Sequence, residues 1–113
     1  MTEKKDINEM IKRLQQMQQQ LQVLMFQKQN VQVQQAEVEN ALKEVESGEQ
    51  TDLYEIIGTV MIKRNREDLL KSLKEKNEIL ELRLSTLDKQ INSLSASAKR
   101  LQDEVISMSK TKK

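Results

Sequence analysis

Histidine and cysteine, the side chains that most often carry out catalysis or bind zinc, are absent from this chain of 113 residues. Carboxylates do occur in close pairs, as at Glu37 and Glu39 or at Glu44 and Glu46, and such pairs can serve as general acid and base. Here they lie beside lysine in sequence typical of solvated helix faces, where nothing would enclose them as an active site does. We therefore expect no enzyme activity, no catalytic residue, no cofactor and no metal site.

The composition argues against other binding chemistries. Gly48 and Gly58 are the only glycines, and neither stands in a phosphate-binding GxxxxGK or GxGxxG pattern. The formal net charge of +1 lacks the basic excess of a nucleic-acid-binding protein. No run of about 18 apolar residues is present, and the start of the chain leads into an amphipathic pattern, so we expect neither a membrane span nor a signal peptide. A chain without cysteine suits a reducing compartment, and the expected location is cytoplasmic.

Two long segments carry the heptad repeat of a coiled coil. Steps of three and four residues define the first stripe: Ile7, Met10, Leu14, Met17, Leu21, Leu24, Lys28, Val31, Gln35, Val38, Leu42 and Val45. The second stripe is Leu70, Leu73, Asn77, Leu80, Leu84, Leu87, Ile91, Leu94, Ala98, Leu101, Val105 and Met108. All but three of these side chains are apolar, and this periodicity predicts helices over residues 6–47 and 66–109 that pack along the two stripes.

Pairing the two stripes in reverse order gives an antiparallel coiled coil within one domain that spans residues 1–113. Residue numbers of facing positions then sum to 115, so that Asn77 faces Val38. A polar residue at such a position either fixes the register or is a tolerated irregularity. Asn65 is expected to cap the second helix and Gly48, in a left-handed conformation, to end the first. A short basic tail, residues 110–113, is expected to follow the second helix.

The segment between the helices, residues 53–63, is rich in β-branched residues and contains one glycine. This predicts a β-hairpin in which Gly58 and Thr59 form a two-residue turn and Ile57 lies opposite Val60. Both faces of the hairpin would carry apolar side chains and both edges would be open, which an isolated two-stranded sheet tolerates poorly. We therefore expect hairpins of several subunits to pair into a shared sheet or barrel. The candidate assembly residues are Tyr54, Ile56, Ile57, Gly58, Val60, Met61 and Ile62.

The opposite end of the coiled coil is expected to expose apolar side chains near both termini. They are Ile7, Met10, Ile11, Val105, Ile106 and Met108. Flexible apolar side chains on fraying helix ends suit adaptable contact with other proteins, although a simply frayed coiled coil has the same sequence pattern. Val23, Met25 and Phe26 lie off the stripe and either line an inward surface or are ordinary exposed apolar residues.

The central stretch Leu53-Tyr54-Glu55-Ile56-Ile57-Gly58-Thr59-Val60-Met61-Ile62-Lys63 resembles the hairpin of β-class prefoldin subunits. The likeness continues through Leu73-Lys74-Glu75-Lys76 and Leu80-Glu81-Leu82-Arg83-Leu84. One hairpin, rather than the two of the α class, indicates the β class. Thr59, where eukaryotic members often have proline, makes the chain look like an archaeal subunit.

The resemblance implies a hexamer of two α-class and four β-class subunits, whose hairpins form an intersubunit β-barrel. Its coiled-coil tips would hold unfolded client proteins without ATP and deliver them to a group II chaperonin. Residues 99–113 contain five basic and two acidic residues, a net charge of +3, which suits docking on an acidic chaperonin surface. The alternative is a coiled-coil scaffold or tether that binds no client.

Overall fold

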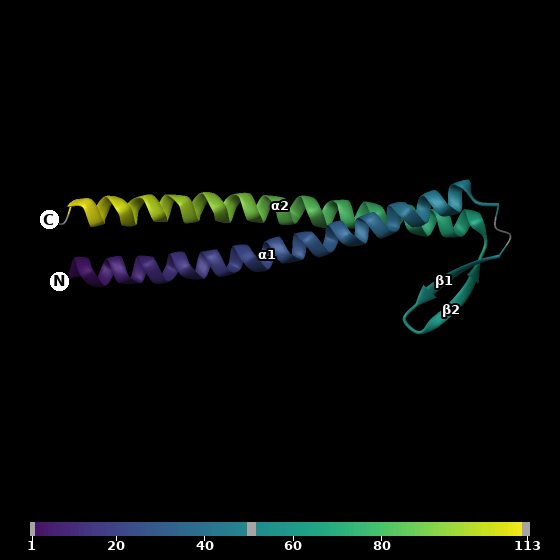
Figure 1. The fold of residues 1–113 in the computed structure, drawn as a ribbon, viewed down its shortest axis with the longest axis horizontal. Coiled ribbons are helices and arrows are strands. Elements are labelled where there is room, and N and C mark those ends of the chain that lie inside the picture. The colour runs from purple at the N-terminus through teal and green to yellow at the C-terminus, as the bar shows by residue number, and fades with distance from the viewer. Residues whose placement is uncertain (1, 50–51, 112–113) are drawn as a thin grey trace. The chain divides into compact units, whose positions relative to one another are not determined.

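The computed structural model describes residues 2–49 and 52–111 and has the element order helix, hairpin, helix (Figure 1). Helix α1 spans Thr2–Ser47, strand β1 Leu53–Ile57, strand β2 Val60–Arg64 and helix α2 Arg66–Thr111. The chain divides into two compact units. One, the terminal unit, holds the helix segments up to Gln29 and from Thr86, and the other, the hairpin unit, holds Asn30–Ser85.

The helices extend further than the heptad pattern predicts. Helix α1 begins at Thr2 rather than at residue 6, and α2 ends at Thr111 rather than at 109. Lys110 is therefore helical rather than part of a separate tail, and its charge lies in the last turn, where the helix dipole favours a cation. The other expected tail residues, 112 and 113, lie outside the described residues. No glycine precedes residue 48 and the chain has no proline, so nothing in the sequence interrupts either helix.

Local hydrogen bonds define the inner helix ends. Asn65 Oδ1 accepts a bond of 2.8 Å from the backbone N–H of Asp68, which confirms Asn65 as the N-cap of α2. At the end of α1, the Ser47 hydroxyl donates to the Lys43 carbonyl at 2.6 Å, and the Gly48 N–H donates to the Glu44 carbonyl at 3.0 Å. The prediction that Gly48 adopts a left-handed conformation is wrong, because Gly58 is the only described glycine with a positive φ. The Gly48 bond instead continues the helical hydrogen-bond pattern beyond Ser47.

The predicted stripes form the buried seam in both units. Every residue of the two stripes is buried or half-buried, and in α1 the only other described residue of that kind is Ala41. The core residues of the hairpin unit are Val31, Val38, Val45, Leu69 and Leu80, and those of the terminal unit are Leu87, Ala98 and Leu101. In the terminal unit, the stripe residues of α1 are thus only half-buried, so the seam there is shallower.

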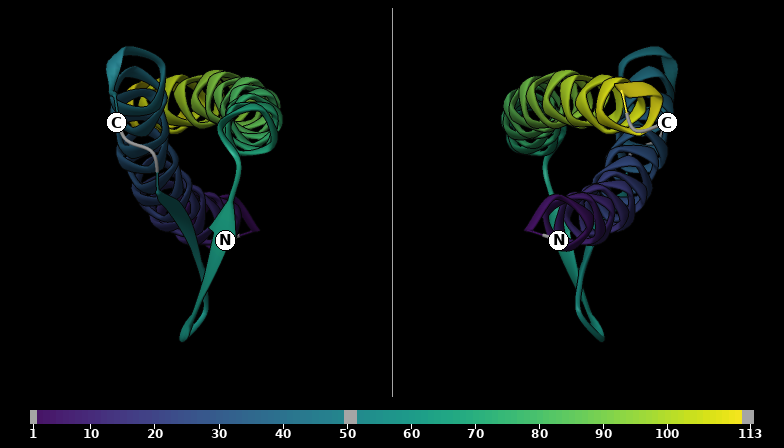
Figure 2. Two further views of the ribbon diagram at one scale, coloured as in Figure 1. Left: turned by 90° about the vertical axis from the view of Figure 1, so that its right-hand side faces the viewer. Right: turned by 90° about the vertical axis from the view of Figure 1, so that its left-hand side faces the viewer.

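Strands β1 and β2 run side by side as a hairpin (Figure 2), and their pairing has the predicted register. Strands β1 and β2 are antiparallel, with Ile57 opposite Val60 and Ile56 opposite Met61. Gly58 has a φ of 62°, and no described residue other than glycine has a positive φ. A positive φ at the first central position alone is the signature of a type II′ turn, whose twist matches that of the flanking strands.

Candidate functional site

The candidate assembly residues all lie on the hairpin, Gly58 in the turn and the other six on the two faces of the strands. The register places Ile56, Met61 and Tyr54 on one face and Ile57, Val60 and Ile62 on the other. Their exposed fractions range from 40% for Ile62 to 69% for Ile56. The sheet contains only these two described strands, so each strand has one unpaired edge. The hairpin therefore combines apolar faces with free backbone hydrogen-bonding groups, which is the chemistry of strand-to-strand association.

A polar cluster attaches the base of the hairpin to α2. The Glu55 carboxylate on β1 lies 3.0 Å from Arg64 Nε on β2 and accepts a hydrogen bond of 3.5 Å from the Ser72 hydroxyl on α2. Glu55 and Arg64 are both half-buried, unlike the more exposed pair of Lys63 and Asp52, whose atoms lie 3.4 Å apart. The Glu55 cluster restrains the direction of the hairpin relative to the start of α2.

The candidate client residues lie in the terminal unit, which contains both helix ends. Ile7, Met10, Val105 and Met108 belong to the seam and are half-buried. Ile11 and Ile106 lie off the seam, with exposed fractions of 37% and 45%. The terminal unit therefore presents two exposed isoleucines. The other four side chains pack partly in the seam and are partly accessible to solvent.

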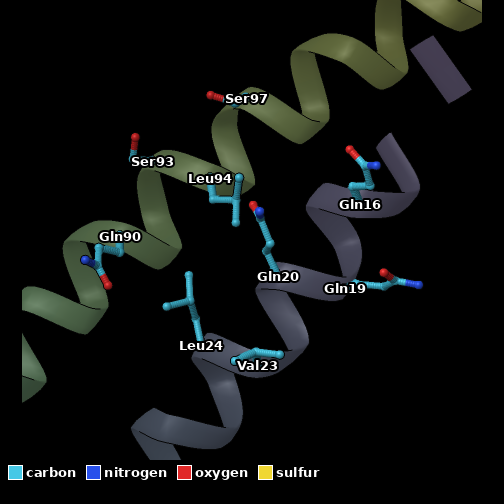
Figure 3. A pocket seen from close by; sticks show the side chains of 9 residues that line it. All are labelled: Gln16, Gln19, Gln20, Val23, Leu24, Gln90, Ser93, Leu94 and Ser97. Atoms are coloured by element: carbon cyan, nitrogen blue, oxygen red, sulfur yellow. The ribbon is translucent and has the colours of Figure 1, made fainter. Parts of the chain in front are cut away.

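A groove between α1 and α2 in the terminal unit was not predicted from the sequence (Figure 3). It has a volume of about 710 Å³ and is lined by Gln16, Gln19, Gln20, Val23, Leu24, Gln90, Ser93, Leu94 and Ser97. Leu24 and Leu94 lie between the two helices in the close-up, with Gln20 reaching across from α1. Of the three off-seam residues in question, Val23 lines this groove. Met25 and Phe26 are exposed but do not line it.

The groove has a signal in the sequence that reasoning from apolar periodicity misses. Leu24 and Leu94 belong to the two stripes, the other lining residues lie off them, and none of the lining residues is charged although 33% of the chain is. Residues 14–27 and 90–98 contain no charged residue, and this pair of uncharged stretches is the sequence signal of the groove.

Neither a metal site nor a membrane span is found in the part of the chain that the structure describes. No group of three or more acidic side chains there could hold a metal ion. Neither α1 nor α2 contains a stretch apolar enough, over the length required, to cross a membrane.

Comparison with known proteins gives consistent matches over most of the chain. The family described as "Prefoldin subunit" matches residues 8–112. The chain is 35% identical over 89 residues to prefoldin subunit beta of Archaeoglobus fulgidus, covering 78% of this chain and 77% of that protein. It is 36% identical over 100 residues to the same subunit of Methanosarcina mazei, covering 88% and 86%. The crystal structure of the prefoldin beta subunit from Thermococcus strain KS-1 superposes with a TM-score of 0.82 at 36% identity, covering 90% of each chain.

Proposed function

Because the chain belongs to the prefoldin family of chaperone subunits, we propose that it is a β-type subunit of an ATP-independent holding chaperone. The observation that carries this proposal is the hairpin, in which six apolar side chains are 40–69% exposed on a sheet with two open edges. A surface of this kind is stabilised when other strands cover it. Partner subunits would supply those strands, so the exposed hairpin is the assembly element.

In the proposed assembly, hairpins of two α-class and four β-class subunits pair into a barrel. Tyr54, Ile56, Ile57, Val60, Met61 and Ile62 provide its apolar contacts, and Gly58 provides the tight turn. Buried apolar area stabilises such an interface by roughly 25 cal/mol per Å². A lysine in place of Ile57 would bring a charge into the interface and oppose assembly.

The terminal unit is the proposed client-binding end. Ile7, Met10, Ile11, Val105, Ile106 and Met108 would contact exposed apolar segments of unfolded proteins. Several arms acting together would hold one client through weak contacts that add by effective concentration. The chain would work in the cytoplasm, without enzyme activity or a cofactor, and pass its client to a group II chaperonin.

Assembly is tested by analytical ultracentrifugation of the chain mixed with an α-class prefoldin subunit. We expect wild type and Ile79→Lys to form the hexamer, because Ile79 is an exposed residue of α2 and not part of the hairpin. Ile57→Lys and Val60→Lys should each reduce the mass of the complex. An unchanged mass in both hairpin variants would refute the role of the hairpin.

Client binding is tested by the suppression of aggregation when a denatured protein is diluted into buffer with the assembled complex. The double variant Ile11→Ser and Ile106→Ser removes the two most exposed apolar side chains proposed for client contact and should weaken suppression, while Ile79→Ser should not. Removal of residues 1–11 and 105–113 should abolish it and leave the hexamer intact. Full suppression by the truncated complex would exclude these residues as the client surface. If the wild-type complex itself suppresses nothing, the scaffold or tether function is favoured instead.

A further inference from the structure

The groove in the terminal unit has no role in the function proposed above, and its lining is chemically uniform. Leu24 and Leu94 lie between the two helices, and Val23, four glutamines and two serines complete the lining (Figure 3). Arg13 lies one heptad before Gln20 on the same face of α1, and Arg100 lies one heptad after Ser93 on the same face of α2. Both are exposed cations and lie towards the helix ends. These cations bound the uncharged surface at its end towards the helix termini.

The glutamine side chains in this groove are available to a ligand. Gln16, Gln19, Gln20 and Gln90 are exposed, and their amides form no hydrogen bond with any residue that the structure describes. Each amide has two N–H donors and an oxygen acceptor. This combination matches a peptide group, which also has one donor and one acceptor, and it does not require a charge on the ligand.

We propose that this groove binds a short, uncharged, extended segment of an unfolded polypeptide through its backbone. An extended strand has unpaired N–H and C=O groups for the glutamine amides, whereas the backbone groups of a helix are already paired. A charged side chain would lose hydration in the groove and find no opposite charge there. The α1 lining from Gln16 to Leu24 extends over roughly 12 Å, which corresponds to about three to four extended residues.

The inference rests on the proposed chaperone function and adds a second mode of contact to it. The exposed isoleucines of the terminal unit would select apolar side chains. The groove would instead bind the backbone of a polar, uncharged segment. A client bound by both the isoleucines and the groove would be held with little dependence on its sequence.

The test measures the fluorescence anisotropy of a labelled, uncharged 12-residue peptide of alternating threonine, serine and valine, titrated with the assembled full-length chain. The groove variant is Gln20→Glu with Gln90→Glu, which keeps side-chain size but adds charge and removes N–H donors. The matched control is Gln18→Glu with Gln102→Glu, because both residues are exposed glutamines of the same two helices and do not line the groove. A second peptide, N-methylated at alternate residues, lacks half of the backbone donors.

We expect the groove variant to bind the unmethylated peptide about tenfold more weakly than wild type, and the control to remain within about twofold. Methylation of the peptide should weaken its binding to wild type by a similar factor and have little further effect on the groove variant. Equal affinity of groove variant and control would overturn the proposal. If the double variant Ile11→Ser and Ile106→Ser loses aggregation suppression but binds the peptide as wild type does, contact through the isoleucines and contact through the groove are separate modes. If the groove proposal fails while wild type still suppresses aggregation, the chaperone function stands without it.

Discussion

Asn77 provides the sharpest test of how the seam determines stability, because it is the one amide in the core-facing stripe of α2. Its Oδ1 atom is buried in the hairpin unit and forms no hydrogen bond with any described residue. A buried polar group without a partner costs roughly 1–3 kcal/mol relative to its hydrated state. The substitution Asn77→Leu removes this cost and adds apolar side-chain area at a position that is already half-buried.

The expected stabilisation of Asn77→Leu is therefore about 1–3 kcal/mol. At an unfolding entropy of roughly 2.1 cal/mol/K per residue, this raises the melting temperature of the chain by about 4–12 °C. The assay is a thermal melt followed by circular dichroism at 222 nm, with subunit concentration held fixed because assembly also shifts the melting temperature.

The control for this prediction is Asn92→Leu, an identical substitution at an exposed position of the same helix. It should change the melting temperature by no more than about 2 °C, since surface substitutions stay within about 0.5 kcal/mol. A melting temperature for Asn77→Leu that is equal to or below that of Asn92→Leu would refute the reasoning. It would mean that Asn77 is paired in the assembled protein or that the seam has no room for leucine.

Three further predictions concern the hairpin and the seam. Glu55→Ala should leave the half-buried Arg64 without its ion-pair partner. We expect this to lower the urea midpoint by an amount equivalent to about 1–3 kcal/mol. Lys63→Ala, which removes one partner of an exposed ion pair, should change the stability by less than about 1 kcal/mol. Leu87→Ala should cost about 2–5 kcal/mol in the same assay, and Ile79→Ala, at a 59% exposed position, much less. Gly58→Val should destabilise the hairpin more than Gly58→Asn, because a β-branched residue is strained at a φ of 62°. Steric contact does not account for the difference, since the space around an added Cβ is free. Thermal melts in which the two variants are equally stable would contradict this.

The buried seam is the part of the fold that the sequence predicts best, because burial in a two-helix coiled coil depends almost entirely on periodicity. Even Lys28 and Gln35, the two polar members of the first stripe, lie at non-exposed positions. Lys28 is accommodated there through an ion pair of 2.8 Å with Asp88 on α2. The register of the hairpin agrees with the pairing of Ile57 and Val60 expected for a two-residue turn with glycine first, although the sequence alone did not exclude other registers.

The features that the sequence did not reveal depend on single hydrogen bonds or on several residues at once. The end of α1 at Ser47 agrees with the prediction, but the conformation of Gly48 could not be read from residue type, since glycine can follow a helix without a left-handed conformation. The link from Glu55 through Ser72 joins a strand to a helix and has no periodic signature. The groove requires uncharged side chains from two helices together with a seam that is shallow at that point, and no single helix shows both.

The division of the chain into two units has a consequence for biosynthesis. The terminal unit joins the helix segment up to Gln29 with the segment from Thr86, whereas the hairpin unit is formed by residues that are contiguous in the chain. All residues of the hairpin unit are therefore available to one another once Ser85 has left the ribosome, whereas the Leu14, Leu21 and Leu24 stripe of α1 lacks its partner residues until the last segment of α2 has emerged. Pairing from the hairpin outward then closes only a small additional loop at each step, which favours rapid completion of the seam after translation.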